Sequence, residues 1–143
     1  PGNFSKLLVL VKLGQFLPFG STNNHRSFIA VENLVSFIIT CINHDKPINE
    51  TFVIADDEQI SIKQLIQSLS LGMGKSTILL PVPTKMIHIL ANATGKIGIF
   101  EQLYGDLQID NSKAKKFFNW QPPKNTFEAL EAVGINYRKN KND

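Results

Sequence analysis

Two residues in the first part of the sequence, Phe19 and Arg26, form a combination that suits phosphate binding. Arg26 stands just before the apolar run 28–31, and Phe19 precedes it across a polar loop. A guanidinium at a strand edge can bind a phosphate through two hydrogen bonds in a partly dry site. An aromatic ring can stack on a nucleobase. The two groups together are what a pocket for a nucleotide sugar needs.

The same residues also fit a purely structural arrangement. Arginine is seldom fully buried without a partner, and Glu32 follows Arg26 closely enough in the chain to pair with it. In that arrangement Phe19 is a residue of the hydrophobic core. The residue types alone leave both interpretations open.

Other motifs for chemistry are incomplete or missing in the sequence. The run 72–77, GMGKST, has Leu69 where a phosphate-binding loop needs its first glycine, and it follows a helical pattern rather than a strand. There is no G-x-G-x-x-G dinucleotide motif and no serine in a nucleophile elbow. The histidines lack ligand spacing, and Cys41 is the sole cysteine. We therefore predict no catalytic residue and no metal site in this chain.

The elements that must position Phe19 and Arg26 alternate between helices and short extended runs. Apolar residues at helical spacing predict helices that begin near residues 3, 31, 61, 84, 111 and 126. Ser61 and Gln64 are expected to form a capping box, and Thr126 is expected to cap the last helix. Extended runs are predicted at 16–19, 28–31, 51–55, 77–83 and 107–109.

This alternation predicts an α/β fold. Only the runs 28–31 and 51–55 read as robust strands, and we expect the second, TFVIA, to be buried on both faces. Two strands make a weak core, so the chain is predicted to be part of a larger α/β protein. We expect one domain over 1–143, with a polar basic tail at 136–143.

Composition and charge narrow the range of partners. The net charge of +3 is small, and no basic stripe carries interleaved aromatic residues, so we predict no nucleic-acid partner. The sequence has no apolar span of about 20 residues and no signal peptide. These features predict no membrane partner and a cytoplasmic location.

Three segments, in the same order, resemble the C-terminal half of extended short-chain dehydrogenases/reductases that act on nucleotide sugars. This NAD-dependent epimerase/dehydratase family includes enzymes of the UDP-glucose 4-epimerase type. The segments are 2–42, GNFSKLLVLVKLGQFLPFGSTNNHRSFIAVENLVSFIITCI, then 51–69, TFVIADDEQISIKQLIQSL, and 104–123, YGDLQIDNSKAKKFFNWQPP. The resemblance covers nearly the whole chain.

The resemblance implies a partial Rossmann-type fold, with few strands and several helices. It implies the substrate-binding part of an enzyme whose N-terminal dinucleotide-binding half is missing here. That half would hold NAD or NADP and the Tyr-x-x-x-Lys pair, so this chain is expected to hold no cofactor and to be inactive alone. The intact enzyme would bind a UDP-sugar and transfer hydride at the sugar C4. A homo-oligomer or self-association is expected, because TFVIA would be left uncovered.

The resemblance also implies contacts for individual residues. Arg26 matches the residue that meets the diphosphate, Phe19 the residue near the uracil, and Asp106 the acid that meets the ribose hydroxyls. Asn3 and Leu7 match the helix that lines the nucleotide pocket.

The chain departs from the family pattern near this site. Gln102 and Leu103 occupy the places of a second diphosphate arginine, and the sequence offers Lys96 as a substitute. Ser27 stands where many members carry aspartate. Two alternatives stay open. One is a 4-keto-sugar reductase or sugar-nucleotide dehydratase of the same superfamily, and the other is a non-catalytic nucleotide-binding or interaction module.

Overall fold

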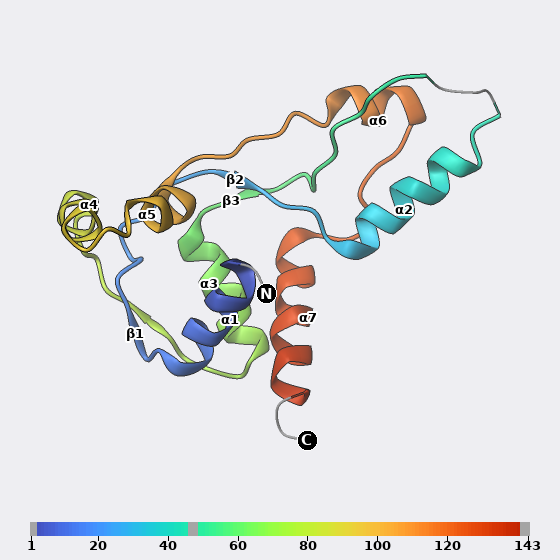
Figure 1. Cartoon of the computed structure of the whole chain (residues 1–143). Coiled ribbons are helices and arrows are strands. Elements are labelled where there is room, and N and C mark those ends of the chain that lie inside the picture. Colours follow the sequence, from blue (N-terminus) through green and yellow to red (C-terminus); the bar gives the residue numbers. More distant parts are fainter. Residues whose placement is uncertain (1–2, 46–48, 141–143) are drawn as a thin grey trace.

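The computed structural model describes residues 3–45 and 49–140, which form an α/β arrangement of seven helices and four short strands (Figure 1). The helices are α1 Asn3–Leu13, α2 Val31–Ile42, α3 Ile62–Gly72, α4 Thr84–Ala93, α5 Ile97–Tyr104, α6 Ser112–Phe118 and α7 Thr126–Lys139. The strands are β1 Phe16–Leu17, β2 Arg26–Ser27, β3 Gln59–Ile60 and β4 Ile78–Leu79. The predicted class, α/β with few strands and several helices, is confirmed.

Figure 1 shows three helices, α1, α3 and α7, gathered at the centre of the molecule. Helices α2 and α6 lie on one side of this centre, and α4 and α5 lie on the other. The main hydrophobic core belongs to the central helices, where Val11, Ile66 and Leu69 are fully buried. Leu7 and Leu8 complete the buried face of α1, as the helical spacing predicted.

Two glycines bring α3 and α7 into close contact. A Cβ atom on Gly72 would overlap the carbonyl oxygen of Glu131, and one on Gly134 would lie 2.5 Å from the carbonyl oxygen of Leu69. The two helices therefore pack backbone against backbone. In the run GMGKST, Gly72 thus serves helix packing, and Gly74 turns the chain at a φ of +67°.

The strands form two separate pairs. β1 and β4 are parallel, whereas β2 and β3 are antiparallel with Arg26 opposite Ile60. A parallel bridge also joins Arg26 to Leu107. There the Ser27 N–H donates to the Leu107 carbonyl at 2.7 Å, and the Leu107 N–H donates to the His25 carbonyl at 2.9 Å. Three segments of chain therefore meet at Arg26.

Both strand predictions that the sequence favoured are wrong. The first has other bounds, and the second run is not a strand. β2 ends at Ser27, and Val31 already begins α2, so 28–31 is not a strand. The run 51–55 has no strand pairing, and Val53 is 57% exposed. A buried strand needs a ladder on each side. Here a single backbone hydrogen bond, from Asp56 N–H to the Phe28 carbonyl at 2.8 Å, joins the ends of these runs.

Helix ends follow local signals closely. Ser61 Oγ accepts from the Gln64 N–H at 3.2 Å, and Gln64 Oε1 accepts from the Ser61 N–H at 2.9 Å, so the predicted capping box is confirmed. The cap of α7 is Asn125 rather than Thr126, because Asn125 Oδ1 accepts from the Phe127 N–H at 2.8 Å.

Residues 136–139 of the basic tail expected over 136–143 belong to helix α7. Helix α7 continues through Lys139, and the ring of Tyr137 packs against the main core. Residues 141–143 lie outside the described residues.

The apolar stripe of α2 is exposed. The helix buries Asn33 and Phe37 instead, and the Phe37 ring packs against Trp120 at 5.1 Å and Phe118 at 5.3 Å between centroids. Its exposed apolar residues are Val31, Leu34, Val35, Ile38, Ile39 and Ile42. The predicted helix is thus confirmed, but its stripe points away from the rest of the described chain.

A buried polar cluster ties the start of α2 to the chain before α7. Asp56, 4% exposed, accepts from the Ala30 N–H at 3.1 Å and from Asn33 Nδ2 at 2.7 Å. Asn33 in turn accepts from the Lys124 N–H at 2.9 Å and donates to the Lys124 carbonyl at 2.8 Å. These bonds satisfy the buried polar groups and fix the chain that leads out of β2.

Candidate functional site

A cavity of about 440 Å³ opens beside α1, α5 and the start of α3. Apolar side chains form most of its wall, and two cations, Lys6 and Arg26, also line it. Its lining includes no carboxylate. A largely apolar cavity with a few polar groups of one sign suits a ligand that has a flat or apolar part and a negative part. The apolar lining includes Leu7, Leu10, Phe28, Leu65, Ile99 and Leu103.

Arg26 is the half-buried cation of this cavity. Its Nη1 donates to the Gly105 carbonyl at 2.7 Å, and its backbone is held by β3 and by Leu107. A guanidinium has five N–H donors in a rigid fork. Gly105 therefore fixes one end of the fork while donors remain for the oxygens of a ligand.

The structure does not pair Arg26 with Glu32. The Glu32 carboxylate binds Lys124 Nζ at 2.6 Å, and this hydrogen bond lowers the pKa of Glu32. Within 3–45 and 49–140, no ion pair involves Arg26. Among the described residues the partner of its side chain is thus a neutral carbonyl, which does not neutralise the charge of Arg26.

The chain on either side of Arg26 is clamped to the segment after α5. Asn24 Nδ2 donates to the carbonyls of Leu103 and Gly105, at 3.1 and 3.2 Å, while its Oδ1 accepts from the Ile62 N–H at 3.1 Å. Asp106 Oδ1 accepts from the His25 N–H at 2.6 Å. Sequence reasoning missed Asn24, because a loop asparagine gives no sign that three distant segments converge on it.

The predicted contact residues lie in different places. Leu7 and Arg26 both line the cavity. Asp106 is exposed and is not a lining residue; its carboxylate holds the backbone next to Arg26. Phe19 is 5% exposed, does not line the cavity, and packs 5.7 Å from the Tyr104 ring. Asn3 begins α1, but its side chain lies outside the described residues.

Tyr104 closes α5 onto the loop after β1. Its hydroxyl donates to the Pro18 carbonyl at 2.9 Å, and its ring stacks on Phe100 at 4.6 Å. Burial raises the pKa of Tyr104 to about 12. The phenol therefore stays protonated at neutral pH and acts as a tether.

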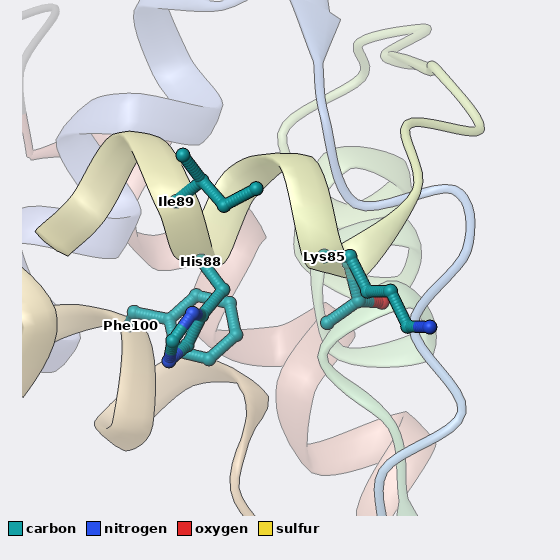
Figure 2. Close-up of a pocket in the computed structure, with 5 residues that line it drawn as sticks. Lys85, His88, Ile89 and Phe100 are labelled. Atoms are coloured by element: carbon teal, nitrogen blue, oxygen red, sulfur yellow. The ribbon is translucent and has the colours of Figure 1, made fainter. Parts of the chain in front are cut away.

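A second cavity, of about 400 Å³, lies at α4 and α5 (Figure 2). His88 packs edge-on against Phe100 there, at 5.1 Å between ring centroids. Figure 2 shows that the Lys85 side chain extends away from this pair. Because its polar groups do not converge, this cavity offers a charged ligand less than the first one does.

The described residues contain neither a cluster of metal ligands nor a helix that could span a membrane. Within 3–45 and 49–140, no three side chains of the His, Cys, Asp and Glu types gather as metal ligands do. None of the helices described is both long enough and apolar enough to span a bilayer.

The chain is 38% identical over 130 residues to a UDP-glucose 4-epimerase of Vibrio cholerae. The predicted resemblance is therefore confirmed. The match covers 90% of this chain but only 40% of the Vibrio epimerase, so the chain spans well under half the length of that relative. No family model matches the chain, and comparison with solved structures gave no match.

Proposed function

We propose that this chain is the substrate-binding part of an NAD(P)-dependent nucleotide-sugar epimerase that acts on a UDP-sugar. The observation that carries the proposal is Arg26, a half-buried cation without a carboxylate partner among the described residues, at the wall of a cavity. The similarity to a UDP-glucose 4-epimerase supports the substrate class. In the intact enzyme NAD or NADP would supply hydride transfer at the sugar C4, and this chain would bind and orient the substrate.

We propose a part for each wall of the cavity. The fork of Arg26 faces the diphosphate, since a planar guanidinium matches phosphate oxygens with two parallel bonds. The base lies against Leu7 and Phe28, because Phe19 is buried away from the cavity. Asp106 accepts from the ribose hydroxyls at the edge, and helix α1, which begins at Asn3, forms the wall beside the nucleotide.

The cofactor is proposed to lie outside this chain. The sequence has no glycine-rich turn that leads from a strand into a helix N-terminus, which is the structure that holds a dinucleotide pyrophosphate. A 4-keto-sugar reductase or a dehydratase of the same superfamily would use the same diphosphate contact. The distinction between them therefore depends on residues other than those of this cavity.

The test is UDP binding to the chain and to its Arg26→Ala and Arg26→Lys variants by calorimetry. Loss of a charge-assisted hydrogen bond of roughly 1.5–3 kcal/mol should weaken UDP binding about 10- to 150-fold. Arg26→Lys should recover part of this loss, because an ammonium lacks the planar fork.

Arg138→Ala is the matched control, since Arg138 lies in the last turn of α7 and does not line the cavity. It should leave UDP affinity unchanged. Unaltered UDP affinity in a folded Arg26→Ala chain would contradict the diphosphate role, and so would a wild-type chain that binds no UDP.

A non-catalytic interaction module is the second candidate, and the exposed stripe of α2 favours it. Six apolar residues on one face of one helix form a larger exposed patch than scattered surface residues do. We propose that the chain associates with a second copy of itself through this stripe. Such association is compatible with UDP binding, because the stripe lies on α2 and the cavity lies beside α1 and α5.

A further inference from the structure

We propose that Lys6 supplies the second positive charge for the ligand's diphosphate, across the cavity from α5. The inference rests on the proposed function and deepens it. Lys6 lies in the first half of α1 and lines the same cavity as Arg26. It is exposed, and none of the ion pairs within the described chain involves it.

The need for a second cation follows from the charge of a diphosphate. Two adjacent phosphoryl groups carry at least two negative charges between them, whereas Arg26 carries one positive charge. A charge that stays unpaired in a partly apolar cavity costs solvation free energy. Gln102 lines the cavity on α5, but an amide brings no charge.

The structure also decides between the two lysines that the chain offers. Lys96 is the residue that precedes α5, it is exposed, and it is not a lining residue of this cavity. Lys6 is a lining residue. The substitute that the sequence suggested, Lys96, is therefore replaced by Lys6, which in the sequence is only a charged residue on the side of the helix opposite the core-facing residues.

The two cations differ in what they contribute. Arg26 is held by the Gly105 carbonyl and so presents a fixed planar fork, which favours a ligand whose phosphate oxygens match the positions of its N–H groups. Lys6 is an ammonium on a flexible stem, and it can follow a phosphate as the ligand settles. We therefore expect the contribution of Lys6 to depend on charge and on salt concentration more than on the shape of the cation.

The experiment is calorimetric titration of the chain with UDP and with UMP, for wild type, Lys6→Gln, Lys6→Arg and Lys96→Gln. Lys6→Gln should weaken UDP binding about 5- to 15-fold, at the lower end of the effect of losing a hydrogen bond to a charged group, because Lys6 is exposed. It should weaken UMP binding less, since UMP has one phosphate. Lys6→Arg should keep most of the UDP affinity, and Lys96→Gln should keep nearly all of it.

The outcomes test the role of Lys6 and the proposed function separately. If Arg26→Ala weakens UDP binding and Lys6→Gln does not, the role of Lys6 is wrong and the proposed function stands. If Lys96→Gln loses as much affinity as Lys6→Gln, the effect is general surface charge, and the role of Lys6 is again wrong. If neither Arg26→Ala nor Lys6→Gln changes UDP affinity, the proposed function itself fails. Lys6→Met is a second neutral variant that keeps helix propensity, should Lys6→Gln unfold.

Discussion

Helices α2 and α3 carry the same apolar pattern but have opposite surroundings. In α3 the residues Ile62, Leu65, Ile66 and Leu69 are between 0 and 3% exposed. In α2 the residues Val31, Leu34, Val35, Ile38 and Ile42 are between 37 and 75% exposed. Both stripes repeat at helical spacing. The difference shows that periodicity identifies an apolar face of a helix. Which segment packs against that face depends on other parts of the structure.

The cover of α3 comes from α1 and α7. Helix α7 approaches so closely because Gly72 and Gly134 have no side chain at the contact. The opposite face of α2 is fixed by Asp56 and by the Phe37 ring, so the helix cannot turn its stripe inward without losing those contacts.

The largest expected effect comes from truncating one leucine in each stripe. Leu69→Ala should lower the free energy of unfolding by about 3 kcal/mol, because Leu69 is fully buried and its loss leaves a cavity. Leu34→Ala should cost less than about 1 kcal/mol, because that side chain is 37% exposed. Urea unfolding of both variants measures this difference. Equal losses would show that the α2 stripe is covered in solution.

A second matched pair tests the approach of α7 to α3. Gly72→Ala places a methyl group against the Glu131 carbonyl and should cost about 2–3 kcal/mol, because the two backbones must separate. Gly98→Ala, in α5, has no atom within 4 Å of the added Cβ and should be neutral or stabilise by up to about 1 kcal/mol. Thermal unfolding compares the two. A harmless Gly72→Ala would mean that the helices do not touch as described.

The sequence predicts those parts of this structure that depend on local signals. The capping box at Ser61 and the helical spacing in α1 and α3 involve residues within one or two turns, so they could be predicted. The strand expected at 51–55 was wrong, because a strand exists only through pairing with neighbours that are distant in sequence, and an apolar run does not reveal them.

In the candidate site, too, residues marked by local signals could be found from the sequence, and residues that depend on distant segments could not. Arg26, which lines the cavity, could be singled out from the sequence, since a cation before an apolar run is unusual in itself. Phe19 could not be placed, because a ring in the core and a ring on a base look alike in sequence. Lys6 and Asn24 gave no sign of their positions, because each depends on the segment 103–105 folding back beside α1 and β2.

Helix α5 is intermediate between α2 and α3 in how far it is attached to the central core, because Tyr104 ties one end of it there. Tyr104→Phe removes the hydrogen bond to the Pro18 carbonyl and should cost about 1 kcal/mol at pH 7. The pKa of this phenol is about 12 in the folded chain and near 10 in an unfolded one. The unfolded chain therefore loses its proton first, and the stability from this group is complete below about pH 10 and is lost as the pH rises through 12.

Urea unfolding at several pH values from 9 to 12 measures this loss. The wild-type chain should lose more stability over that interval than Tyr104→Phe, since the variant has no phenol at this position. If both lose stability equally, the phenol of Tyr104 is not buried in solution.

The smallest effect on stability, and the sharpest test of the comparison, is a charge placed in the α2 stripe. Ile38 is 47% exposed, so Ile38→Lys should change the free energy of unfolding by less than about 0.5 kcal/mol. It should nevertheless reduce self-association, because an ammonium in an apolar interface loses water without gaining a partner. Leu71→Lys adds the same charge at an exposed position on α3 and should leave association unchanged. Light scattering over a range of concentrations reads the result. A wild-type chain that stays monomeric, or a Leu71→Lys variant that dissociates as readily as Ile38→Lys, would show that the exposed stripe does not join copies of the chain.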